Sequence, residues 1–175
     1  IAGRKSIAIA LTEPSAGSDA ARLKLKAVRD GSDFLLSGEK TSISMATQAD
    51  VAVVFARTGT EADRARGISA FLVPMDLPGV SRTTFDDIGT RPVGRGSIFF
   101  DGVRIGADMM LGDEGQGFIQ VMQGFDYSRA LIGVLLELLR IHARRLRDAR
   151  QDLVDFFLDR LHLLAARLGP VLELG

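Results

Sequence analysis

The chain has 175 residues, of which 46% are apolar, enough to bury the core of one domain with an appended element. Twenty-two basic residues balance 22 acidic ones, so the formal net charge is zero. This neutrality argues against a nucleic-acid partner, because proteins that bind nucleic acids carry a basic surplus. The lack of cysteine excludes disulfides, thiolate metal sites and a cysteine nucleophile. No apolar run predicts a membrane span.

Residues 6 to about 113 show the pattern of short β-strands separated by turns. Apolar runs predict strands at 6–11, 51–56 and 68–73. Alternation predicts a strand over 23–28, which turns at Asp30-Gly31 into a strand through 34–36. A last strand, 97–100, is expected to end in a turn at Asp101-Gly102. Many short strands without βαβ alternation predict a barrel or sandwich and argue against a doubly wound nucleotide fold.

From about Gly117 the apolar period becomes helical. Residues 131–141 are apolar on nearly all sides, which predicts a helix buried on most of its surface. The helical period returns over 153–168, and a break is expected between Arg147 and Gln151. The sequence therefore predicts a β domain over 1–113 and two helices in 114–175. His142 and His162 lie on these helices without partners of metal-ligating type nearby, so we interpret them as ordinary helix residues.

A polar loop, Thr12-Glu13-Pro14-Ser15-Ala16-Gly17-Ser18-Asp19, follows the first strand. Pro14 fixes the direction of exit, and Gly17 lets the backbone approach a ligand closely. The hydroxyls of Thr12 and Ser18 could hold a phosphate or the edge of a heterocycle. The alternative is a strand-to-helix turn in which Ser18 or Asp19 caps a helix. The residues of the loop alone leave both interpretations open.

The order of several segments resembles that of acyl-CoA dehydrogenases. Residues 10–19 resemble the family's flavin signature, and 38–44 its second flavin segment. The match continues in the family's order through 50–57, 67–73, 91–103, 112–118 and 125–129. The resemblance implies an α+β, mainly β fold: a middle-domain β-barrel or sandwich followed by C-terminal helices. It also implies FAD-dependent oxidation of an acyl-CoA thioester to the α,β-enoyl-CoA, with hydride transfer to the flavin.

The resemblance implies roles for individual residues. Thr12 and its neighbours would bind the flavin pyrimidine edge, and Ser44 replaces a threonine that approaches flavin N5. Ser42 replaces a tryptophan that packs on the flavin ring, which is a departure from the family. The implied FAD-binding residues are Ile9, Leu11, Thr12, Gly17, Ser18, Ser42, Ile43 and Ser44, and the implied acyl-CoA-binding residues are Ser18, Asp126 and Arg129.

The catalytic base is not identified. In the family this carboxylate lies far downstream or, in some members, at the position that Ser128 occupies here, and a serine cannot do that work. Glu137 lies on the same predicted helix, but nothing in its surroundings marks it as a base. Beyond about residue 140 the sequence departs from the family. Two alternatives follow: a non-catalytic fragment that binds flavin or CoA, and a flavin monooxygenase or oxidase of the same fold, against which the segment Asp126 to Arg129 argues.

The resemblance further implies an electron-transfer flavoprotein or similar acceptor as a partner, and a homo-oligomer for the full-length protein. A cytoplasmic location is expected, or the mitochondrial matrix in a eukaryote. The sequence of residues 41–45 faintly resembles that of the family branch that acts on cyclic acyl-CoAs.

Overall fold

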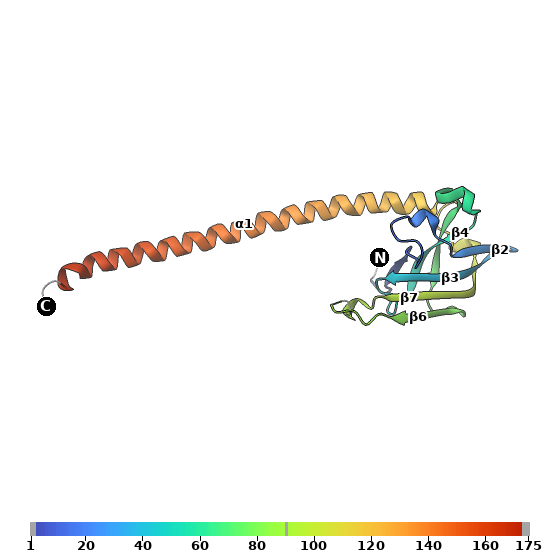
Figure 1. The fold of residues 1–175 in the computed structure, drawn as a ribbon, viewed down its shortest axis with the longest axis horizontal. Coiled ribbons are helices and arrows are strands. Elements are labelled where there is room, and N and C mark those ends of the chain that lie inside the picture. The colour runs from blue at the N-terminus through green and yellow to red at the C-terminus, as the bar shows by residue number, and fades with distance from the viewer. Residues whose placement is uncertain (1–2, 90, 173–175) are drawn as a thin grey trace. The chain divides into compact units, whose positions relative to one another are not determined.

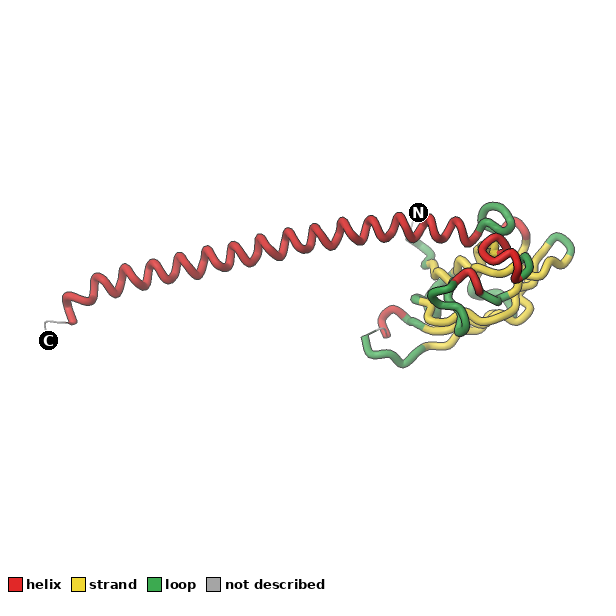
Figure 2. Tube along the Cα trace, turned by 45° about the horizontal axis from the view of Figure 1, so that its top comes forward, coloured by secondary structure: helices red, strands yellow, loops and turns green. Residues whose placement is uncertain are grey.

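The computed structural model describes residues 3–89 and 91–172, with the backbone alone at 149, 156–157 and 160–172. The chain divides into two compact units, Ile1–Gly124 and Phe125–Gly175. The first unit is built on strands and the second is helical (Figure 2). The strands are β1 (Ile7–Ala10), β2 (Lys26–Asp30), β3 (Asp33–Ile43), β4 (Val51–Arg57), β5 (Ile68–Pro74), β6 (Val80–Thr84) and β7 (Gly96–Gly106). The helices are α1 (Gly117–Leu172) and the short 3-10 helices Ala20–Arg22, Glu61–Gly67, Arg91–Val93 and Ala107–Met109.

The strands form one seven-stranded sheet in the order β1-β4-β2-β3-β7-β6, with β5 also paired to β4. Figure 1 shows β2, β3, β7 and β6 side by side. β1 runs parallel to β4, whereas β3 is antiparallel to both β2 and β7. This curved sheet is a half-barrel, which confirms the predicted fold class; the doubly wound arrangement is absent from the described residues.

Alternation places the core on the inner face of the sheet. Ala8 and Ala10 of β1 are buried, while Ile7 and Ile9, which alternate with them, are more than half exposed. These alanines pair with Ala52 and Val54 of β4, and all four side chains belong to the buried core. Phe34 of β3 meets Phe71 of β5 edge to face, with the ring centroids 5.1 Å apart.

The predicted hairpin after Asp30 is confirmed, but the turn predicted at Asp101-Gly102 is wrong. Strand β7 continues through these residues to Gly106. The register steps three residues along β7, from Phe100 to Val103, for two along β3, so the extra residue forms a bulge. Gly102 has a φ of +59°, which both a tight turn and a bulge of this kind require. The strand β6 was not predicted, because most of its side chains are exposed and lack an apolar alternation.

Two expectations for the helical part are wrong. α1 runs without interruption through Arg147–Gln151, a stretch with no glycine or proline to break a helix. The apolar side chains over 131–141 are 42–61% exposed rather than buried, because no second element of this unit packs on them among the described residues. Across the part of the chain that the structure describes, no helix has the length and apolarity needed to cross a membrane.

Candidate functional site

The polar loop after β1 begins with a tight turn. The backbone N–H of Glu13 donates to the carbonyl of Ala16, and the N–H of Ala16 donates back to Glu13, both at 3.1 Å. Gly17 and Ser18 follow and are exposed. Asp19 then precedes the short helix Ala20–Arg22 but makes no side-chain capping bond to it. The alternative interpretation of Asp19 as a helix cap is therefore not supported.

The two segments that resemble flavin-binding sequences lie next to each other. The Thr41 N–H donates to the Thr12 carbonyl at 2.9 Å, which joins the loop after β1 to β3. Just beyond this bond β3 carries a bulge, because three steps from Lys40 to Ile43 match two steps on β7. Ser42 sits in the bulge with a left-handed φ of +58°, a conformation that costs a non-glycine residue about 1 kcal/mol. Bulges and strained residues of this kind are frequent beside functional sites.

Exposure divides the eight predicted cofactor residues into three groups. The side chains of Leu11 and Ile43 are buried, so a ligand could touch only their backbone. Thr12 is half-buried, and the other five are exposed: Ile9, Gly17, Ser18, Ser42 and Ser44. Ser42 and Ser44 are exposed on either side of Ile43, the last residue of β3, whose side chain is buried in the core. The hydroxyls that the resemblance assigns to the cofactor are thus accessible.

Ser42 has a charged neighbour at the position where the resemblance implies a tryptophan. Arg95 Nη2 donates to Ser42 Oγ at 3.2 Å. The same guanidinium is ion-paired with Asp87 and lies 5.4 Å from the centre of the Phe85 ring. An anchored guanidinium therefore lies beside the small side chain at position 42.

A buried ion pair connects the loop to β3, since Glu13 belongs to the loop and Lys40 to β3. Lys40 Nζ is 2.8 Å from Glu13 Oε1, and both side chains are almost completely removed from solvent. Sequence analysis missed this pair, because its members are 27 residues apart and neither is marked by a local pattern. Burial lowers the pKa of Lys40 to about 8, although the charge of Glu13 and its hydrogen bond act in the opposite direction.

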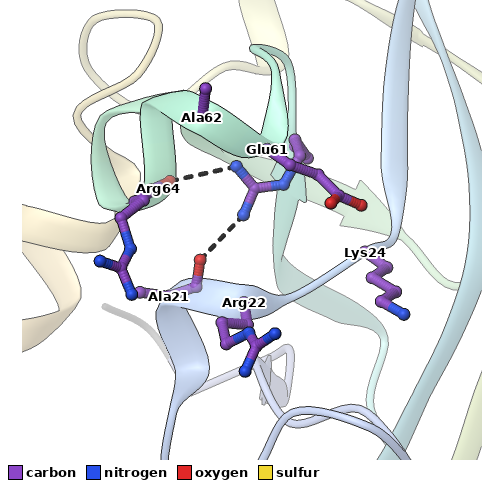
Figure 3. A pocket seen from close by; sticks show the side chains of 7 residues that line it. Ala21, Arg22, Lys24, Glu61, Ala62 and Arg64 are labelled. Carbon is purple, nitrogen blue, oxygen red and sulfur yellow. Dashed lines mark hydrogen bonds between the residues drawn. The ribbon is translucent and has the colours of Figure 1, made fainter.

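A basic pocket of about 500 Å³ lies beside the short helix Ala20–Arg22. It lies between the segment of Ala21, Arg22 and Lys24 and the facing segment of Glu61, Ala62 and Arg64 (Figure 3). Its lining includes four basic side chains and one acidic side chain: Arg22, Lys24, Arg57, Arg64 and Glu61. This excess of positive charge suits an anionic ligand. Sequence analysis did not identify it, because the basic residues come from three separate segments.

The predicted CoA-contacting residues lie on α1 in the second unit. Arg129 Nη1 is 3.1 Å from Asp126 Oδ1, and both side chains are largely exposed. Ser128 donates its hydroxyl to the Phe125 carbonyl at 3.0 Å, and Glu137 lies 3.6 Å from Arg140 Nη1 on the exposed surface. Neither observation marks a base.

His142 belongs to no metal-binding cluster among the described residues. His142 is exposed, and the side chain of His162 lies outside the described residues. The described residues contain no cluster of three or more histidine, cysteine, aspartate or glutamate side chains that could hold a metal ion.

Comparison with known proteins agrees with this geometry. The sequence profile of the acyl-CoA dehydrogenase middle domain matches residues 8–103. Acyl-CoA dehydrogenase AFT10-1 of Alternaria alternata is 36% identical over 151 residues, which are 86% of this chain and 34% of that protein. The long-chain specific mitochondrial acyl-CoA dehydrogenase of Sus scrofa is 40% identical over 136 residues, covering 77% of this chain and 32% of its own.

Solved structures extend the likeness to three dimensions. The crystal structure of a probable acyl-CoA dehydrogenase from Mycobacterium abscessus superposes with a TM-score of 0.70 at 35% identity, over 73% of this chain and 34% of that one. The chain spans about a third of the length of the curated relatives that it matches. The matched profile covers more than half of the chain, and the half-barrel and the helix after it have the family's architecture. The chain belongs to the acyl-CoA dehydrogenase family.

Proposed function

We propose that the chain is the flavin-facing part of an FAD-dependent acyl-CoA dehydrogenase that converts an acyl-CoA to its α,β-enoyl form. The observation that carries the proposal is the Thr41–Thr12 hydrogen bond, which joins the two segments that resemble flavin-binding sequences. The exposed hydroxyls of Ser18 and Ser44 have the chemistry to bind the flavin, since hydroxyls both donate and accept. Ser42 is smaller than the tryptophan that the resemblance implies at this position, and Arg95 donates to its hydroxyl.

The flavin, when bound, would accept the hydride from the substrate, and the chain would orient the reacting groups. Thr12 would hold the pyrimidine edge, Ser44 would lie near N5, and Ser18 would lie near the pyrophosphate and the CoA chain. The domain division that we propose is 1–113 for the flavin-binding domain and 114–175 for part of the helical domain. A cytoplasmic or mitochondrial-matrix location stays a prediction, as does preference for a cyclic acyl-CoA.

The basic pocket lined by Arg22, Lys24 and Arg64 supports a CoA thioester as the substrate class. CoA carries several phosphate groups, and Arg22, Lys24 and Arg64 present accessible cationic side chains at this pocket. Asp126 and Arg129 would contact CoA as well, as the resemblance implies. We expect the chain to bind CoA more tightly than pantetheine, which lacks the nucleotide, and the difference to shrink as the salt concentration rises. Arg22→Ala combined with Arg64→Ala should remove most of this difference in a calorimetric titration.

A non-catalytic role in binding flavin is the second candidate. It is favoured by two observations on α1: Ser128, at the position where the resemblance implies a base in some relatives, donates its hydroxyl to the Phe125 carbonyl, and Glu137 lies beside Arg140 on the surface. An electron-transfer flavoprotein as acceptor and assembly into a homo-oligomer also stay proposals.

One experiment separates these functions. The purified chain is mixed with FAD and desalted, and its flavin absorbance is recorded before and after an acyl-CoA is added without oxygen. Retained flavin that bleaches supports the dehydrogenase. Retained flavin that never bleaches supports a binding role without a base. Failure to retain any flavin contradicts both functions for this chain.

A further inference from the structure

The buried pair of Glu13 and Lys40 joins three stretches of backbone. Lys40 Nζ donates to Glu13 Oε1 at 2.8 Å and to the Leu11 carbonyl at 3.1 Å. The Glu13 carboxylate also accepts the backbone N–H of Lys24 at 2.6 Å and that of Leu25 at 2.9 Å. The pair therefore connects the end of β1, the middle of β3 and the segment that enters β2.

These contacts hold Thr12 from both sides. Leu11, which precedes it, is bound through its carbonyl to Lys40, and Glu13, which follows it, is bound through its side chain to the same ammonium. The carbonyl of Thr12 itself accepts the N–H of Thr41. Three successive residues are thus fixed to β3, so the orientation of the Thr12 backbone and hydroxyl depends on Lys40.

Packing alone does not explain why this site holds two charges. Removing a carboxylate and an ammonium from water costs several kcal/mol, and well-packed apolar residues of the same volume often stabilise a protein more. An apolar side chain at position 40 could not bind the Leu11 carbonyl, which would be left facing the core. The ion pair supplies directional bonds that a core of leucine or methionine lacks.

We propose that Glu13 and Lys40 are positioning residues for the flavin: they hold the Leu11–Thr12 backbone in its binding geometry and thereby set the affinity for FAD without touching it. This inference rests on the proposed function. Both side chains are almost completely buried, so they are shielded from a ligand on the surface of the loop. Their effect on the flavin therefore passes through the backbone of Leu11 and Thr12.

The test compares FAD binding by the wild-type chain with binding by Lys40→Met, followed by the quenching of flavin fluorescence. Loss of the ammonium should weaken FAD binding about tenfold or more, equal to roughly 1.4 kcal/mol. The control is Val103→Ala, which removes volume at a fully buried position of β7 that pairs with Leu36, away from the loop. It should lower the urea midpoint of unfolding while FAD binding stays within about twofold of wild type, a difference of roughly 0.4 kcal/mol.

A second variant covers the case in which Lys40→Met does not fold because Glu13 is left charged and buried. Glu13→Gln combined with Lys40→Met removes both charges and keeps an amide oxygen for the Leu25 N–H. It should fold and show the same loss of FAD affinity. Hydrogen exchange at the Thr41 N–H, which reports the bond to Thr12, should accelerate more in this double variant than in Val103→Ala.

The outcomes distinguish the inference from the function on which it rests. Absence of FAD binding by the wild-type chain would refute the proposed function and the flavin role of the pair together. FAD binding by wild type that both Lys40 variants retain would refute the positioning role alone. An equal loss of affinity in Val103→Ala would also refute it, because the effect would then follow from stability.

Discussion

Arg57, the last residue of β4, offers a quantitative test of how this fold is held beside the basic pocket. Its side chain is buried, with 7% exposed, and its guanidinium donates to four backbone carbonyls. The acceptors are Leu23 at 3.0 Å, Ala21 at 2.8 Å, Thr60 at 3.0 Å and Arg64 at 3.1 Å. One side chain therefore joins the end of β4 to both segments that line the pocket.

The expected loss of stability depends on which of the four carbonyl acceptors cannot bind water once the guanidinium is removed. Arg57→Met keeps much of the apolar stem but removes all four hydrogen bonds. The bond to the Leu23 carbonyl is buried, whereas the other three are partly buried and their acceptors can recover water. A hydrogen bond to a charged group contributes about 1.5–3 kcal/mol, and bonds in one network do not add independently. We expect Arg57→Met to lower the free energy of unfolding by about 3–5 kcal/mol.

Arg57→Lys separates charge from geometry. An ammonium keeps the positive charge but has three donors and no planar fork, so it cannot reach all four acceptors. We expect a loss of about 1–3 kcal/mol, smaller than that of Arg57→Met. The matched control is Arg82→Met on β6, where an exposed arginine donates to the carbonyls of Thr47 and Ala49. It should change stability by less than about 1 kcal/mol, since water replaces those bonds.

Urea unfolding followed by circular dichroism measures all three variants against wild type. The same proteins should be titrated with CoA, because Arg57 also lines the pocket. Arg57→Met should weaken CoA binding more than Arg57→Lys, which keeps a charge there. An unfolding free energy of Arg57→Met within about 1 kcal/mol of wild type would refute the reasoning, because the loss of the buried Leu23 bond alone should exceed that value.

Three further outcomes are expected. Gly117→Ala should lower the stability of the fold by about 1–3 kcal/mol, because the new Cβ would lie 2.6 Å from the Ala70 nitrogen. In Gly124→Ala the new Cβ meets no atom within 4 Å, so this variant should gain up to about 1 kcal/mol of stability. Thermal unfolding of both variants tests these expectations. The pKa of Lys40 is lowered from 10.5 to about 8, so the folded chain releases this proton at a lower pH than the unfolded chain does. Between pH 8 and 10.5 the unfolding free energy of the wild-type chain should therefore rise, relative to that of Lys40→Met, by up to about 1.4 kcal/mol per pH unit in urea titrations. A difference between the two proteins that does not change with pH would contradict this. Ser44→Ala should weaken FAD retention by roughly threefold to tenfold in equilibrium dialysis, and Ser44→Thr should restore it; unchanged retention in Ser44→Ala rejects the assignment to N5.

Local sequence determined most of the strands and the start of the helix. Alternation and apolar runs are properties of neighbouring residues, so they located β1, β4 and β5 and the hairpin between β2 and β3. Local signals failed where one residue is compatible with two different backbone structures. Gly102 suits a turn or a bulge equally, and only its pairing with β3 decided for the bulge. The segment where a helix break was expected contains no glycine or proline, so α1 continues through it.

The sequence by itself also determined the family and the two loop segments of the candidate site, because these motifs are contiguous. Tertiary structure alone decided how they are held. The bond between Thr12 and Thr41, the pair of Glu13 and Lys40, and the fork of Arg57 each join residues that lie on different strands or loops. Such contacts depend on strand order and register, which bring distant residues within a few ångströms, and no pattern of neighbouring residues encodes them.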